Sequence, residues 1–111
     1  MELSAKMITI DCAEPRELAD WWAGVLGVEV AQDFGEFVVL AAQPLVLGFQ
    51  RVPEEKVGKN RIHVDFASPD RKGDVDRLVK MGAMIVGEHT APGLAWTTLQ
   101  DPAGNEFCVS G

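Results

Sequence analysis

The residues best suited to chemistry are a histidine and two carboxylates on stretches that alternate like strands: His63, Asp65 and Glu106. Ile62 and the alternate residues after it are apolar and are predicted to face a helix, which places His63 and Asp65 on the opposite face. The alternation near the end of the chain places Glu106, Cys108 and Ser110 on that face as well. A positioned carboxylate and imidazole can remove and donate protons, and both can bind a divalent cation.

Matching positions in the first half carry different side chains. The same alternation places Thr9, Asp11 and Gln50 on the corresponding face, with Thr9 as the counterpart of His63 and Gly48 as the counterpart of Glu106. Trp96 is either a stacking surface for a planar ligand or a residue packed under the second helix. The predicted ligand-binding residues are Thr9, Asp11, Gln50, Asp65 and Trp96.

An internal repeat justifies comparing the two halves. Ile10 to Pro15 is echoed by Val64 to Pro69, and 65 − 11 and 69 − 15 both give an offset of 54. Each copy precedes a stretch of helical period that ends in glycine, at Gly27 and Gly82. A chain of 111 residues is too short for two independent cores, so the copies are expected to share one domain.

The elements follow from periodicity and turn residues. The pattern predicts an α+β fold of two βαβββ modules, paired into one curved eight-stranded mixed sheet with helices outside and a concave cavity inside. Residues 1–111 form a single domain, with module one at about 5–51, a linker at 52–60 and module two at about 61–111. Strands are expected near 7–13, 28–32, 36–42, 45–51, 61–67, 83–88, 94–100 and 105–110, and helices from Glu14-Pro15 to Gly27 and from Ser68-Pro69-Asp70 to Gly82.

Composition narrows the classes of partner. The formal charge of −7 disfavours nucleic acid and anionic membranes, and no apolar run approaches the ~20 residues of a membrane span. The first residues form no apolar leader, so a cytoplasmic location is expected. Cys12 and Cys108 lack metal-type spacing and are predicted to be small buried residues.

Three segments carry a resemblance to a known family. They are the helix Leu18-Ala19-Asp20-Trp21-Trp22 that ends in Leu26-Gly27, the stretch Lys59 to Asp65, and the tail Asp101-Pro102-Ala103-Gly104-Asn105-Glu106-Phe107. Together with the paired modules, they resemble the vicinal oxygen chelate superfamily, which includes glyoxalase I, bleomycin-resistance proteins and extradiol dioxygenases. The match is closest to its small glyoxalase-like members and covers essentially the whole chain.

The resemblance implies a site for one divalent metal. His63 and Glu106 stand where metal-using members place ligands, whereas Thr9 and Gly48 occupy the matching first-half positions. Asp65 and Asp11 are further oxygen donors. Zn²⁺ takes about three or four protein ligands. The set is therefore incomplete, and either one metal (Zn, Ni, Fe or Mn) or none is compatible with it.

Two functions remain open. One is a small-molecule-binding protein that holds its ligand in the concave cavity beside a degenerate metal site. The alternative is a divalent-metal-dependent lyase, isomerase or dioxygenase, with Glu106 as base and His63 as ligand or acid. A homodimer is expected from the resemblance and from the edge strands of an open sheet.

Overall fold

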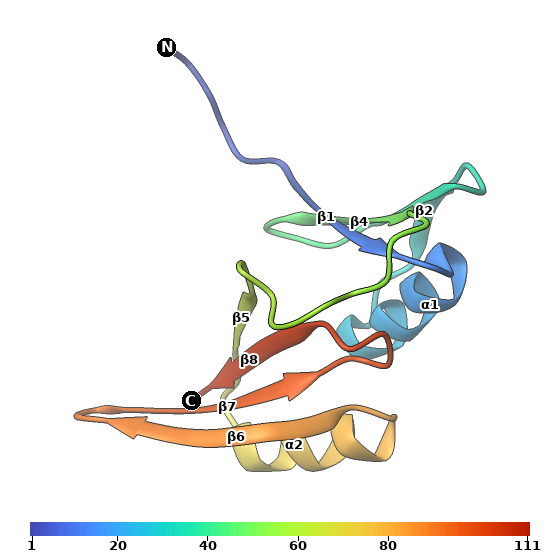
Figure 1. Cartoon of the computed structure of the whole chain (residues 1–111). Coiled ribbons are helices and arrows are strands. Elements are labelled where there is room, and N and C mark those ends of the chain that lie inside the picture. The colour runs from blue at the N-terminus through green and yellow to red at the C-terminus, as the bar shows by residue number, and fades with distance from the viewer. The chain divides into compact units, whose positions relative to one another are not determined.

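Two helices and eight strands make up the computed structural model, which describes residues 1–111 (Figure 1). The predicted α+β class and its two βαβββ modules are confirmed, and each module forms its own four-stranded mixed sheet. The elements are β1 (Met7–Cys12), α1 (Pro15–Leu26), β2 (Val30–Asp33), β3 (Phe37–Leu40), β4 (Val46–Arg51), β5 (Val64–Ala67), α2 (Arg71–Lys80), β6 (Met84–Ala91), β7 (Leu94–Gln100) and β8 (Glu106–Ser110). Neither helix is long and apolar enough to cross a membrane.

The first compact unit, Met1–Lys56, has the strand order β1-β4-β3-β2. β1 and β4 are parallel, and the remaining neighbours are antiparallel. α1 lies against β3 and β4, where Val38 and Phe49 are fully buried. Trp22 of α1 is also buried, as expected for the apolar stripe of this helix, and it packs edge-on against Trp21 at 5.0 Å between ring centroids.

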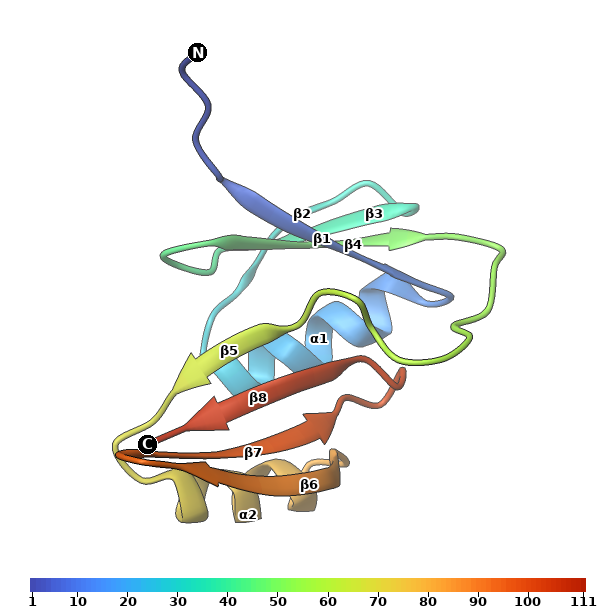
Figure 2. The same cartoon turned by 60° about the vertical axis from the view of Figure 1, so that its left-hand side comes forward.

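The second unit, Val57–Gly111, repeats this topology with the order β5-β8-β7-β6 (Figure 2). β5 and β8 are parallel, and α2 lies against β7 and β8. Leu99 and Phe107 are buried in this unit, and the Phe107 ring meets Phe66 edge-on. The expected strand at 61–67 is shorter than predicted because it begins at Val64. Ile62, predicted to face the helix, is 79% exposed.

The two helices begin differently although their sequences repeat. α1 starts at Pro15, and Glu14 before it provides no side-chain cap. In the second copy the helix starts two positions later, after Asp70, whose side chain accepts a hydrogen bond from the backbone N–H of Gly73 at 3.1 Å. The carboxylate satisfies one of the unpaired amides of the first turn, so Asp70 rather than Pro69 fixes where α2 begins.

Candidate functional site

The second sheet has one face toward α2 and one polar face. Arg71 at the start of α2 donates a hydrogen bond to Thr97 Oγ1 at 2.8 Å, which assigns Thr97 to the helix face. Thr98 therefore projects to the other face, because successive strand residues alternate. Strand register places Cys108 opposite Thr98 on one side and opposite Asp65 on the other. The row Asp65, Cys108 and Thr98 thus crosses three neighbouring strands on the polar face.

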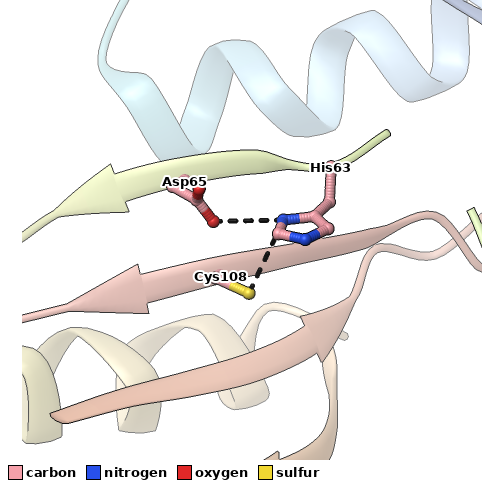
Figure 3. A group of neighbouring side chains, drawn as sticks. All are labelled: His63, Asp65 and Cys108. Atoms are coloured by element: carbon pink, nitrogen blue, oxygen red, sulfur yellow. Dashed lines mark hydrogen bonds and ion pairs between the residues drawn. The ribbon is translucent and has the colours of Figure 1, made fainter. Parts of the chain in front are cut away.

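His63 joins this row from the residue stretch just before β5 (Figure 3). Its Nδ1 lies 3.1 Å from Asp65 Oδ1 and 3.9 Å from Cys108 Sγ. The Thr98 hydroxyl is 3.4 Å from the same sulfur. His63 and Asp65 are exposed, whereas Cys108 is buried. One imidazole, one carboxylate and one thiol therefore converge within a single module.

Glu106 lies at the start of β8 and is only 7% exposed. The side-chain amide of Asn60, oriented to satisfy both of its partners, donates to Glu106 Oε2 at 2.8 Å and accepts from the Glu106 backbone N–H at 3.2 Å. The backbone N–H of Asn60 donates to the same carboxylate oxygen at 3.4 Å. Asn60 thereby fixes the orientation of a buried carboxylate, since a buried charge needs hydrogen-bond donors.

The turn before β8 holds Glu106 in place. Asp101 Oδ1 accepts hydrogen bonds from the backbone N–H groups of Ala103 at 3.0 Å and Asn105 at 2.9 Å. The Asn105 side chain donates to Asp101 Oδ2 at 3.1 Å. Asp101 is buried and acts as the centre of the turn, so this pair is structural, as the sequence predicts.

Trp96 lies on the polar face of β7. It is two residues before Thr98, and its ring stacks on that of His89 in β6, with centroids 5.2 Å apart. Strand register places these two residues directly opposite one another. Strand alternation therefore places the Trp96 ring on the same face as Cys108, so the geometry favours the first of the two alternatives for Trp96, a stacking surface.

The first unit keeps the row geometry with different side chains. Thr9 pairs with Gly48, and Asp11 pairs with Gln50. A Cβ atom on Gly48 would lie 2.8 Å from Phe37 Cζ and 3.1 Å from Met7 Sδ. The position equivalent to Glu106 is therefore covered by the tip of the Phe37 ring and by the Met7 sulfur, and a side chain there would require both to shift.

The structure brings some of the predicted residues together and adds two. His63 contacts Asp65, and Asp11 lies beside Gln50. Burial of both cysteines is confirmed, but Cys108 is also part of the polar row. Asn60 and the thiol of Cys108 were not among the predicted site residues. The alternation of the last strand places Cys108 on the same face as Glu106, and this pattern is the sequence signal that could have identified Cys108 as a site residue.

Comparison with known proteins agrees with this architecture. Residues 7–110 match the glyoxalase-like domain, and the chain belongs to that family, within the vicinal oxygen chelate superfamily. No curated protein matches the sequence.

Solved structures share the fold at low sequence identity. A fosfomycin resistance protein, FosX, from Listeria monocytogenes has a TM-score of 0.82 at 11% identity, covering 99% of this chain and 93% of that one. A glyoxalase/bleomycin resistance protein/dioxygenase family enzyme from Burkholderia phytofirmans PsJN has a TM-score of 0.77 at 19% identity, covering 95% of each chain. A possible glyoxalase from Bacillus cereus has a TM-score of 0.78 at 16% identity, covering 99% of this chain and 100% of that one.

The donor set expected from the superfamily is not complete in this chain. His63 and Glu106 supply an imidazole and a carboxylate, but Gly48 has no donor and Thr9 offers only a hydroxyl. Phe37 and Met7 occupy the space where a further ligand would project. Thr9 and Gly48 therefore do not supply the first-module ligands that the superfamily pattern implies.

Substitution of Gly48 tests how tightly this position is filled. Gly48→Ala is expected to lower the free energy of unfolding by about 1 kcal/mol, because the new methyl group has to displace the tip of the Phe37 ring. Chemical denaturation measures the interaction energy between positions 48 and 37. It compares the wild type, Gly48→Ala, Phe37→Leu and the variant that carries both changes. The double variant should recover at least ~0.5 kcal/mol relative to the sum of the single changes. Strict additivity would show that the ring does not fill the site.

Proposed function

We propose that this chain is a small-molecule-binding protein that holds its ligand against the polar face of the second sheet, without requiring the metal site of its superfamily. The observation that carries the proposal is the contrast between the two modules. The second places His63, Asp65 and Glu106 along one face, whereas Gly48 of the first lies beneath Phe37 and Met7. Binding needs a few polar anchors and an apolar surface, and both are available without a complete donor set.

The chemistry of the site favours a neutral or cationic ligand with a planar group. Asp65 and Glu106 are acidic, and the whole chain carries a formal charge of −7. Trp96, stacked on His89, offers an aromatic ring on the same face. Planar groups stack on such rings, and cations are attracted to them. Thr9, Asp11 and Gln50 of the first module are kept as proposed ligand-binding residues.

Metal-free bleomycin is a suitable probe because it is cationic and has a planar aromatic end. Titration calorimetry in the presence of a chelator should show one binding site per chain. Trp96→Ala should weaken binding by about tenfold, which corresponds to about 1.4 kcal/mol of lost stacking. Phe34→Ala, which removes an aromatic ring that is 66% exposed, is the matched control and should bind normally.

Fosfomycin is an anionic phosphonate, so the same titration with fosfomycin tests whether the site prefers a cationic ligand to an anionic one. It should bind more weakly than bleomycin, because the acidic face repels an anion. Absence of bleomycin binding to folded protein, or unchanged affinity in Trp96→Ala, would contradict the proposed ligand class.

A second candidate is a lyase, isomerase or dioxygenase that uses a divalent metal. Glu106 favours it, because its buried carboxylate is held in one orientation by Asn60, as a catalytic base would be. His63 would then act as metal ligand or acid.

Turnover of the hemithioacetal of methylglyoxal and glutathione separates the candidates. With added Ni²⁺, Co²⁺ or Zn²⁺, the binding proposal expects no rate above that of the protein-free mixture. A rate in the wild type that falls at least ~100-fold in Glu106→Gln would instead establish the enzyme. Circular dichroism of the variant checks that it is folded.

We further propose that the chain forms a homodimer. β6 lies at the edge of the second sheet, and it exposes Met84, Ile85 and Val86, all apolar. An exposed apolar edge strand is a template for pairing with another chain.

Light scattering at micromolar concentration should give twice the chain mass of 12.1 kDa. Ile85→Lys should shift the protein toward monomer, since a charge at the edge opposes pairing. Leu94→Lys, at a comparably exposed position on the neighbouring strand, is the control. A wild-type mass of 12.1 kDa would exclude the dimer under these conditions.

A further inference from the structure

The three side chains that converge in the second module offer three different ligand atoms. One imidazole nitrogen of His63, one carboxylate oxygen of Asp65 and the sulfur of Cys108 all lie within 4.8 Å of one another. Figure 3 shows the three side chains. They come from the stretch before β5, from β5 itself and from β8. The parallel register that pairs Asp65 with Cys108 fixes two of them on adjacent strands.

The arrangement does not suit proton relay to a nucleophilic thiol. In such a triad the two nitrogens of the imidazole face different partners, one the thiol and the other the carboxylate. Here both the Asp65 carboxylate and the Cys108 sulfur face the same nitrogen, Nδ1 (Figure 3). One N–H can donate to the carboxylate at 3.1 Å, so the sulfur, 3.9 Å from the same nitrogen, has no comparable bond to His63.

A cation placed between the three atoms would be bound by all of them. We propose that His63, Asp65 and Cys108 form a binding site for one borderline divalent cation of the Zn²⁺ type. Zn²⁺ bonds of about 2.0–2.3 Å in tetrahedral geometry place ligand atoms about 3.3–3.8 Å apart. The separations from His63 to Asp65 and to Cys108, 3.1 and 3.9 Å, bracket that range. The carboxylate and the sulfur lie within 4.8 Å of one another, so side-chain rotation has to bring these two atoms to the same spacing.

The donor chemistry selects the class of metal. A thiolate with an imidazole favours Zn²⁺, Co²⁺ or similar ions over Mg²⁺ and Ca²⁺, which prefer oxygen ligands. Three protein ligands leave a fourth position for water or for an oxygen of a bound small molecule. This site differs from the superfamily set, because it lies within one module and uses Asp65 and Cys108 instead of Glu106. It shares His63 and Asp65 with the ligand-binding face proposed above, but the two proposals are tested separately, because ligand binding is measured with a chelator present.

Cobalt reports directly on the sulfur ligand. Titration of tag-free, metal-free protein with Co²⁺ should reach one ion per chain and produce a thiolate-to-cobalt charge-transfer band in the near ultraviolet. Cys108→Ser should lose this band. Cys12→Ser, which changes the other buried cysteine, should keep it. Zn²⁺ should displace Co²⁺ and abolish the band.

The carboxylate ligand is tested in the same assay with a matched pair from the repeat. Asp65→Asn should weaken Co²⁺ binding by at least ~10-fold, since loss of a direct ligand costs no less than loss of a supporting one. Asp11→Asn, at the equivalent position of the first module, should not change it. Asp65 is 68% exposed, so its substitution is not expected to disturb folding, and circular dichroism verifies this.

Glu106→Gln distinguishes the proposed site from the superfamily set and should leave the band intact. The proposal is overturned if the wild type binds no stoichiometric Co²⁺, or if the band survives in Cys108→Ser. It is also overturned if Co²⁺ binding requires Glu106 while Asp65→Asn binds normally.

Discussion

The parallel pairing of the first and last strands of each module is the constraint on which the site depends. A parallel pair cannot be closed by a tight turn, so a helix and two further strands lie between β5 and β8 in the sequence. Once the register is set, Asp65 lies opposite Cys108 although the two are distant in sequence. The apolar face of the sheet enforces this register, because a one-residue slip would move Phe107 and Val109 to the opposite face.

The two modules share a backbone plan but differ in chemistry, because the side chains that contact equivalent strand positions differ. In the second module, Glu106 is buried but has the amide of Asn60 as its partner. In the first, Gly48 is buried beneath the Phe37 ring and the Met7 sulfur. A buried carboxylate is tolerated only where donors reach it, so the loop that carries Asn60 decides whether this strand position can hold a charge.

The fold was predictable from the sequence because its signals are local. The helical stripe that includes Leu18 and Trp22 and the strand alternation both act over a few residues, and the elements they predict are present. The site was only partly predictable. Alternation assigned Cys108 to the correct face, but its distance from His63 depends on register between strands, which no local pattern contains. The contact of Asn60 with Glu106 depends on the path of a loop, which strand alternation does not describe. Ile62 was expected within a strand but is exposed before the strand begins, because periodicity locates the ends of a strand poorly.

The polar groups of the second module form a continuous chemical unit. His63, from the stretch before β5, contacts Asp65, which lies opposite Cys108 on the neighbouring strand. Glu106 lies two residues before Cys108 in β8, on the same face. All of them, with Asn60, belong to residues 57–111, so their mutual geometry is set by one sheet and its adjoining loops. The first module is then free to fill the equivalent space with Phe37 and Met7, which add apolar packing where a donor is not needed. A duplicated fold can thus keep its architecture through both copies while a single copy carries the chemistry, because architecture depends on the buried face and chemistry on the other.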